Sequence, residues 1–266
     1  MPLELSHLID KTPCFPDVRG RVALVTGGGT GIGRGIARRL ALEGMKVAIC
    51  GRRAEQLAET ADLIQQAGRE VLAVPCDVSD AAAIDDLCER TLGKFGRVDA
   101  LVHNAMAMHF PALEEVTLER WDEAFATAPR AALLLCQRLV PGMAERGHGG
   151  IVFVSSVLAQ RPNRNGLPYV AAKGALEAMG RQLATAFADA GIRVNTLAPG
   201  RIASRREASE DSLPNQLIPV GRAGTPAEMA AIVAFLLSDQ SSYITGQVIH
   251  ADGGTSIQLV PPGFQL

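Results

Sequence analysis

The sequence predicts an α/β fold: a single doubly wound Rossmann-fold domain whose parallel sheet has helices on both faces. Three observations support this prediction. Short apolar runs alternate with segments of helical periodicity, and such alternation builds a parallel sheet through right-handed crossovers. A glycine-rich turn joins the first apolar run to the first helical segment. The 266 residues, 47% of them hydrophobic, are enough to bury one large core.

Seven strands and six helices are expected, each bounded by a change in apolar periodicity. The strands are expected near residues 21–26, 46–50, 70–75, 98–103, 150–155, 192–198 and 247–250. The helices are expected near residues 31–44, 54–67, 80–94, 117–145, 168–190 and 226–238. The strand order would be 3-2-1-4-5-6-7, which places a ligand beyond the carboxyl ends of the strands.

The first strand, 21–26, leads into the glycine-rich turn and then into the first helix. The residues of this turn that we expect to contact a ligand are Gly27, Thr30, Gly31, Ile32 and Gly33. Strand, glycine turn and helix in this order are the context that a dinucleotide-binding fingerprint requires. Glycine allows close backbone approach, and the helix N-terminus offers unpaired N–H groups to a pyrophosphate. The alternative is a glycine-rich turn that binds nothing.

Tyr169 and Lys173 are four residues apart in the predicted helix 168–190, so they share one face. An ammonium group favours the phenolate, so Lys173 is expected to lower the pKa of Tyr169 from its ordinary value of about 10. A tyrosine tuned in this way can exchange a proton with an alcohol or a carbonyl. Ser156 follows the apolar run 150–154, and a hydroxyl there can face the same substrate oxygen. Alone, the Tyr-Lys pair could be two residues on a partly exposed helix.

Taken together, these motifs resemble those of the short-chain dehydrogenase/reductase (SDR) family. The pattern from Thr26 to Gly33 is similar to the Thr-Gly-x-x-x-Gly-Ile-Gly motif of that family. Further matching blocks are Cys76-Asp77-Val78, His103-Asn104-Ala105, Arg193-Val194-Asn195 with Pro199-Gly200, and Ala251-Asp252-Gly253-Gly254. The resemblance runs from about residue 21 to residue 254, nearly the whole chain.

The resemblance implies hydride transfer between a nicotinamide cofactor and a carbonyl or alcohol substrate. It assigns hydrogen bonding of the substrate oxygen to Ser156, proton donation to Tyr169, and contact with the nicotinamide ribose to Lys173. Besides the glycine turn, Tyr169 and Lys173, it places the cofactor against Asp77, Val78, Asn104, Ala105, Pro199, Gly200 and Ile202. Asp77 would bind the adenine amino group, and Asn104 would support the central ribose.

The cofactor is expected to be NADP(H). A site specific for NAD(H) would place an acid near the end of the second strand, to bind the ribose 2′-hydroxyl. This chain instead has Arg52 and Arg53 after that strand. Guanidinium groups can pair with a 2′-phosphate, and no carboxylate at these positions would repel it. The alternative is two arginines on a solvated loop.

The chain departs from the family pattern at two positions. Ala128 stands where the family usually has an asparagine, seven residues after Trp121, that helps to hold a water linking the catalytic lysine to solvent. Pro129 should kink the helix, and we expect this kink to free the carbonyl of Phe125 for that water. The alternative is a broken relay with slow turnover. Met106 replaces a glycine, so it is either strained, a wall of an apolar pocket, or simple packing.

These departures leave a second functional hypothesis open. The protein could use bound NADP(H) as a structural element for a non-redox reaction, or could sense the cofactor. The intact Ser156, Tyr169 and Lys173 argue against it, because a binding module does not need them. The sequence leaves the substrate unidentified.

The formal charge of −2 gives no reason to expect nucleic acid or a membrane surface as a partner. Five scattered cysteines suggest reduced thiols of a cytoplasmic protein. His103 and His109 are expected to be structural or substrate-facing, and His148 a solvated loop residue. Residues 1–20 should form an arm, 21–256 the domain with a substrate lid at 201–219, and 257–266 a tail. The resemblance also implies a homo-oligomer, a tetramer or a dimer, with helices 117–145 and 168–190 at one interface.

Overall fold

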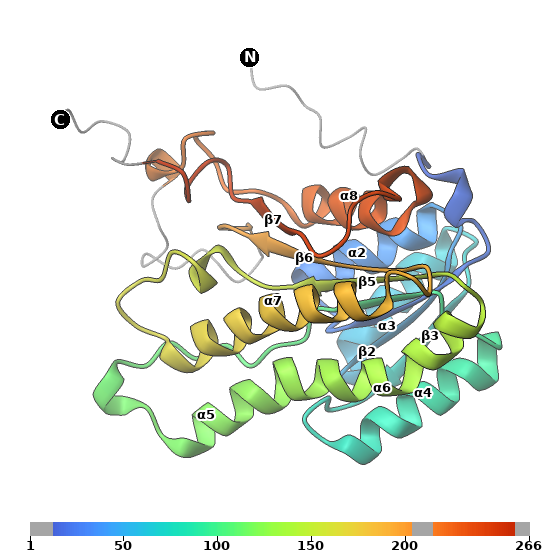
Figure 1. Ribbon diagram of the computed structural model, residues 1–266, viewed down its shortest axis with the longest axis horizontal. Coiled ribbons are helices and arrows are strands. Elements are labelled where there is room, and N and C mark those ends of the chain that lie inside the picture. The colour runs from blue at the N-terminus through green and yellow to red at the C-terminus, as the bar shows by residue number, and fades with distance from the viewer. Residues whose placement is uncertain (1–12, 204–214, 259–266) are drawn as a thin grey trace.

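The computed structural model describes residues 13–203 and 215–258 and contains a seven-stranded parallel sheet (Figure 1). The strands are β1 (Val22–Thr26), β2 (Lys46–Gly51), β3 (Val71–Pro75), β4 (Ala100–His103), β5 (Gly149–Val154), β6 (Ile192–Pro199) and β7 (Val248–Ala251). Their order is β3-β2-β1-β4-β5-β6-β7, with every neighbouring pair parallel. The predicted fold class and strand order are therefore confirmed.

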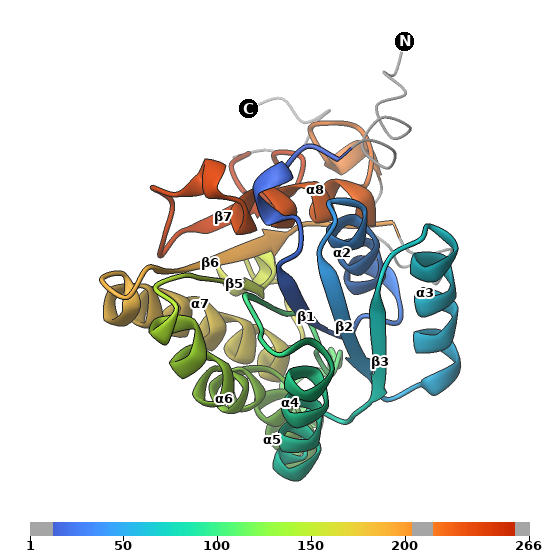
Figure 2. The same cartoon turned by 90° about the vertical axis from the view of Figure 1, so that its right-hand side faces the viewer.

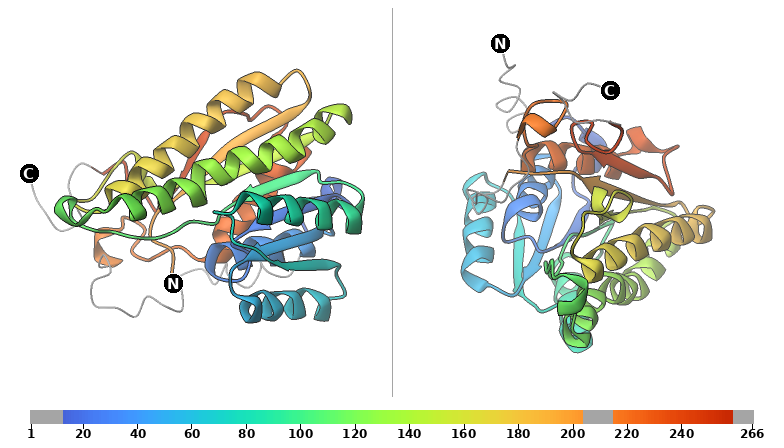
Figure 3. Two further views of the ribbon diagram at one scale, coloured as in Figure 1. Left: turned by 90° about the horizontal axis from the view of Figure 1, so that it is seen from below. Right: turned by 90° about the vertical axis from the view of Figure 1, so that its left-hand side faces the viewer.

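Helices cover both faces of this sheet. They are α2 (Gly31–Leu42), α3 (Ala54–Gln66), α4 (Ala81–Phe95), α5 (Leu118–Phe125), α6 (Ala131–Glu145), α7 (Leu167–Phe187) and α8 (Pro226–Leu237). Figure 2 shows α2, α3 and α8 on one face and α4 to α7 on the other. In Figure 3, α6 and α7 lie side by side along the second face.

The core is divided by the sheet into two apolar layers. In β1, Ala23 and Val25 pack into the layer under α2, α3 and α8, while Val22 and Leu24 pack into the layer under α4, α6 and α7. Successive side chains of a strand point to opposite faces, so a strand buried on both faces is a continuous apolar run. This is why the strands show no alternation of polar and apolar residues.

Several helices begin and end at residues that satisfy their terminal backbone groups. The Asp80 side chain accepts from the backbone N–H of Ala82 at the start of α4, and Gly96 ends that helix with a φ of 78°. Thr225 and Glu228 form a capping box at the start of α8. These local signals fix the helix boundaries within a few residues of the predicted ones.

The predicted helix 117–145, in which Pro129 was expected to cause a kink, is not continuous. It is interrupted between α5 and α6 by a turn of π-helix, Ala126–Arg130, which contains Pro129. Proline has no N–H to donate, and the wider turn accommodates this: the N–H of Ala131 reaches the carbonyl of Ala126, five residues back. We refer to residues 126–130 as the wide turn.

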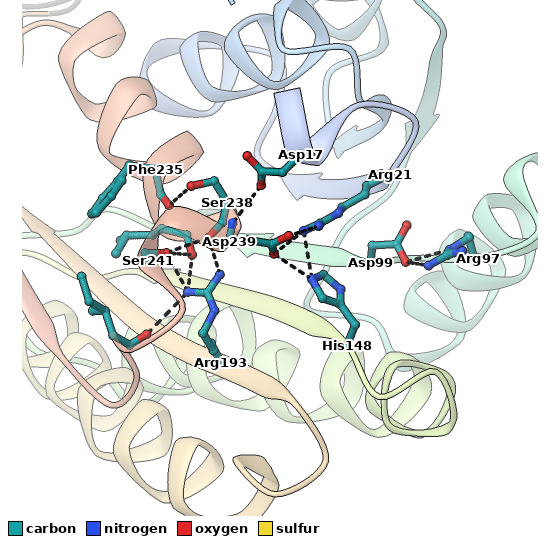
Figure 4. Close-up of polar contacts among 12 residues, drawn as sticks. Asp17, Arg21, Arg97, Asp99, His148, Arg193, Phe235, Ser238, Asp239 and Ser241 are labelled. Atoms are coloured by element: carbon teal, nitrogen blue, oxygen red, sulfur yellow. Dashed lines mark hydrogen bonds and ion pairs between the residues drawn. The ribbon is translucent and has the colours of Figure 1, made fainter. Parts of the chain in front are cut away.

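The amino ends of the strands carry a polar cluster far from the glycine turn (Figure 4). Asp239 accepts two hydrogen bonds from the Arg21 guanidinium, at 3.1 and 2.6 Å. His148 lies 2.9 Å from Arg21 and 3.4 Å from Asp239, measured from its Nε2 atom. His148 lies in the loop before β5 with 36% of its side chain exposed, which agrees with the prediction of a solvated loop residue, and it has these two partners in addition.

The arm, lid and tail predicted from the sequence lie partly outside the described residues, at 1–12, 204–214 and 259–266. The described end of the arm packs on the surface, where the buried carboxylate of Glu43 accepts from the backbone N–H groups of Cys14 and Phe15. All five cysteines lie in the described ranges and are thiols, not disulfides. Within the described ranges, no helix is both long and apolar enough to cross a bilayer, and no cluster of three or more possible metal ligands occurs.

Candidate active site

The glycine turn is closely packed against the end of β4. Gly27 has a φ of 66°, and a Cβ at this position would lie 2.7 Å from the Asn104 side-chain nitrogen. A Cβ at Gly33 would collide with the Gly27 carbonyl oxygen. Gly31, with a φ of 52°, faces open space at the first residue of α2. The turn therefore leaves room beside an unpaired helix N-terminus, which fits a pyrophosphate.

Arg34, which the sequence reasoning missed, fixes the outer side of this turn. Its Nε donates to the Gly29 carbonyl at 2.9 Å and to the Thr60 hydroxyl at 3.0 Å. A terminal nitrogen pairs with Glu59 at 2.7 Å. The only sequence signal for this role was a cation in the first turn of a helix, where the helix dipole does not favour one.

The two arginines after β2 point to different neighbours. Arg53 reaches the glycine turn, with a terminal nitrogen 3.4 Å from the Thr30 hydroxyl. Arg52 lies 3.7 Å from a carboxylate oxygen of Glu123 on α5. Both side chains are exposed, and Arg53 is the one the structure brings to the predicted phosphate-binding turn.

The remaining predicted cofactor contacts follow the ends of β3, β4 and β6, at the same edge as the glycine turn. Asp77 is half-buried and accepts from the backbone and hydroxyl of Ser79, at 2.9 and 2.8 Å, while Val78 packs into the core. Asn104 donates its side-chain amide to the Thr26 carbonyl at 3.1 Å, and the N–H of Ala105 donates to the Thr26 hydroxyl at 3.0 Å.

At the end of β6, the segment from Pro199 to Ile202 is held from one side. The N–H of Gly200 donates to the Ala251 carbonyl, and a Cβ at Gly200 would lie 2.6 Å from the Asp252 Cβ. Ile202 is buried. All of these predicted positions therefore occur at the carboxyl edge, where a doubly wound sheet binds its ligand.

Ser156, Tyr169 and Lys173 come together next to this edge, and all three are buried. Ser156 lies two residues after β5 and begins a short 3-10 helix, where its hydroxyl accepts from the N–H of Leu158 at 3.2 Å. Tyr169 and Lys173 share a face of α7, with the lysine Nζ 5.7 Å from the ring centroid. The Lys173 ammonium donates to the Val154 carbonyl, 2.5 Å away, which ties α7 to the end of β5.

The pKa values of these groups differ from the sequence-based expectation. Burial raises the pKa of Tyr169 above its ordinary value, and the Ser156 hydroxyl opposes this shift. Burial lowers the pKa of Lys173 to about 7. The prediction that Lys173 lowers the pKa of Tyr169 was wrong for this structure, because burial of the phenol raises its pKa by more than the Ser156 hydrogen bond lowers it.

The structure shows how Met106 and Phe110, in the segment after β4, are packed. Among the described residues, only glycines have a positive φ, so Met106 is not strained. Its side chain packs against the apolar core, as simple packing predicts. Phe110 instead lies against Tyr169, with the two ring centroids 4.9 Å apart. Phe110 is therefore the side chain of this segment that the structure places against the Tyr169 ring.

Glu177, also missed from the sequence, is a buried carboxylate one turn after Lys173. It accepts from the Ser155 hydroxyl at 3.0 Å and from the Gln160 side-chain amide at 3.0 Å. These two donors flank Ser156 in the chain, so Glu177 holds the segment that carries the serine against α7. An acid four residues after Lys173 was the available signal, because it lies on the same helix face.

Comparison with known proteins identifies the family. A family model described as enoyl-(acyl carrier protein) reductase matches residues 27–256. Dehydrogenase/reductase SDR family member 4 of Sus scrofa is 36% identical over 254 residues, which cover 91% of this chain and 89% of that protein. The chain belongs to the short-chain dehydrogenase/reductase family. It is therefore a hydride-transfer oxidoreductase in its general class.

Two solved SDR structures show the range of cofactors among its relatives. L-sorbose reductase from Gluconobacter frateurii, complexed with NADPH and L-sorbose, is 31% identical with a TM-score of 0.87, and the match covers 92% of this chain and 100% of that one. A 7α-hydroxysteroid dehydrogenase complexed with NADH is 29% identical with a TM-score of 0.85, and the match covers 90% and 96%. SDR membership thus leaves the choice between NADP(H) and NAD(H) to the residues of the individual chain.

Proposed function

We propose that this SDR chain is an NADP(H)-dependent oxidoreductase that acts on a carbonyl or alcohol substrate through Ser156, Tyr169 and Lys173. The observation that carries this proposal is the meeting of these three side chains at the edge that also holds the glycine turn. When bound, the nicotinamide supplies or accepts the hydride. The protein would bind it along the glycine turn, Asn104 and the segment 199–202.

The chain's own groups account for the proton. A Tyr169 whose pKa is raised by burial stays protonated at neutral pH, so its hydroxyl can donate to a substrate oxygen that Ser156 also binds. Lys173, with a pKa of about 7, can both give and accept a proton near neutral pH, which suits a group that reprotonates the tyrosine. The ring of Phe110 keeps water from one side of the phenol.

Preference for NADP(H) is supported by Arg53 beside Thr30, and by the absence of an acid at positions 51–53. An arginine there offers a fork of donors to a 2′-phosphate. Five cysteines present as thiols and not as disulfides support a location in a reducing compartment such as the cytoplasm. Exposed leucines on the long helices, Leu118 on α5 and Leu133 on α6, support a homo-oligomer, either a tetramer or a dimer.

The test is NADPH oxidation against a panel of ketones, quinones and aldehydes, with NADH in parallel and Tyr169→Phe as the matched variant. We expect turnover with at least one carbonyl class, a lower KM for NADPH than for NADH, and a loss of about 100-fold or more in kcat for Tyr169→Phe with NADPH binding retained. Tight NADPH binding without oxidation across the panel would favour the non-redox hypothesis. A lower KM for NADH would overturn the cofactor assignment alone.

A further inference from the structure

The wide turn at 126–130 is buried beside the candidate active site. Ala126, Thr127 and Ala128 are all buried, and Ala128 packs into the apolar core without a polar side-chain atom. Because the backbone pairing shifts from four to five residues here, the turn has carbonyl groups that a regular helix would have paired differently. Buried carbonyl groups of this kind need other donors.

Two side chains join this turn to the end of β4. The Thr127 hydroxyl accepts from the N–H of Ala107 at 3.1 Å and donates to the Glu123 carbonyl at 2.8 Å. The His103 Nε2 atom lies 3.1 Å from the Ala128 carbonyl oxygen. The carbonyl identified with a side-chain donor is therefore that of Ala128, and not that of Phe125 as the sequence suggested.

The chemistry of the partners fixes the direction of each bond in this network. A carbonyl oxygen only accepts, so the His103 Nε2 carries the hydrogen and Nδ1 accepts from the Thr26 hydroxyl, 3.0 Å away. The Thr26 oxygen in turn accepts from the N–H groups of Asn104 and Ala105, both at 3.0 Å. Every step is satisfied, so the network connects the wide turn to the glycine turn without a charged member.

The network also lies close to the catalytic lysine. Burial lowers the pKa of His103 to about 3, and the charge of Lys173 contributes to this shift. The imidazole is thus neutral over the working range of pH and serves as a fixed donor and acceptor. A 1 Å displacement of a supporting backbone can cost about 100-fold in rate, so the position of this turn matters for catalysis.

We propose that Thr127 and His103 are positioning residues that hold the wide turn against the end of β4. Neither residue touches the reacting atoms. Thr127 fixes the segment at Ala107, from the side that leads to Phe110 and Tyr169. His103 fixes the Ala128 carbonyl from the side that leads to Asn104. This inference rests on the proposed reductase function.

The test uses Thr127→Val, which removes the hydroxyl at nearly constant shape, and Thr127→Ser, which restores it. Thr91→Val is the matched control, because Thr91 is a fully buried threonine on α4 whose hydroxyl bonds only within its helix, to the Leu87 carbonyl. We expect Thr127→Val to lower kcat by about 10- to 100-fold with KM for NADPH changed less than about threefold. Thr127→Ser should recover most of the loss, and Thr91→Val should leave kcat unchanged.

A second measurement does not depend on turnover. Hydrogen exchange at the Ala107 amide should accelerate in Thr127→Val and not in Thr91→Val, since only the former removes its acceptor. Nitrogen NMR of the imidazole should show His103 protonated at Nε2. A wild-type protein that reduces nothing, but shows both signatures, would overturn the reductase function and keep the geometry. Unchanged kcat in Thr127→Val, failed rescue by serine, or unchanged Ala107 exchange would overturn the positioning role.

Discussion

His103 makes stability depend on pH at the scale of a single residue. Its folded-state pKa is lowered to about 3 from an unfolded value of about 6.5, mainly because burial penalises the imidazolium. Between these two values the unfolded chain binds more protons than the folded one. The stability associated with neutral His103 is therefore complete above pH 6.5 and is lost as the pH falls toward 3.

We expect His103→Asn to remove this dependence, since an amide can donate and accept but does not titrate. Urea unfolding of both proteins between pH 8 and pH 4.5 measures it. The difference in unfolding free energy between wild type and variant should shrink on acidification by on the order of 2 to 3 kcal/mol. A difference that stays constant with pH would contradict the assignment of a neutral, buried imidazole.

At the same scale, residue spacing predicted which side chains meet but not how they titrate. Tyr169 and Lys173 share a helix face because they are four residues apart, and this could be predicted from the sequence alone. The pKa of Tyr169 is raised by burial and lowered in part by the Ser156 hydrogen bond, and both are properties of the packed site. Glu177 was missed because its two partners, Ser155 and Gln160, lie in the segment after β5 and not on its own helix.

Among the elements, the glycine turn between β1 and α2 is the most sensitive to a small substitution. Gly33→Ala would push a methyl group into the Gly27 carbonyl, so the turn must open. Gly93→Ala is the matched control, because Gly93 lies within α4 with open space around it. We expect Gly33→Ala to lose NADPH binding and stability, and Gly93→Ala to gain about 0.5 to 1 kcal/mol from helix propensity.

Thermal unfolding and NADPH titration of the two variants measure this contrast. If Gly33→Ala bound NADPH with an affinity close to that of the wild type, the prediction would be contradicted. The turn would then be able to shift enough to accept a methyl group at Gly33. Both substitutions add the same methyl group to a helix. The expected difference between the two variants therefore comes from the packing of the β1–α2 connection.

The wide turn shows where prediction at the element scale stops. Pro129 indicated that the helix could not run unbroken from 117 to 145, and this was correct. Whether a proline produces a bend, a break or a π-turn depends on which neighbours satisfy the released backbone groups. Here the partners are the side chain of His103, at the end of β4, and the Thr127 hydroxyl and Ala131 N–H, which belong to the turn itself or follow it directly.

For the whole molecule, the alternation of elements was sufficient to predict the sheet, because parallel strands joined by right-handed helical crossovers allow few topologies. Which residues gather at each of the two edges of the sheet was predicted only in part. The carboxyl edge followed from the motifs, whereas the polar cluster at the amino edge joins Arg21, His148 and Asp239 from distant segments without a local pattern (Figure 4).

Because the candidate active site lies at the carboxyl edge, we expect substitutions at the amino edge to lower the free energy of unfolding without changing catalysis. Asp99 is the residue that tests this expectation. Its buried carboxylate, just before β4, accepts from the Val22 N–H at 2.9 Å and from Arg97 at 2.7 Å, with Arg146 3.7 Å away. Asp99→Asn leaves these guanidinium groups without a counter-ion and should cost about 2 to 4 kcal/mol of unfolding free energy.

The matched control is Asp85→Asn, which breaks an exposed pair with Arg138 and should cost much less, since water screens both charges. Neither substitution should change kcat or KM for NADPH, because the proposed catalytic side chains and the glycine turn lie at the opposite edge of the sheet. Chemical denaturation and steady-state kinetics on the same preparations separate the two effects. If Asp99→Asn altered KM for NADPH as strongly as stability, strain at one edge would reach the other through β1 and β4, and the two edges would act as one unit.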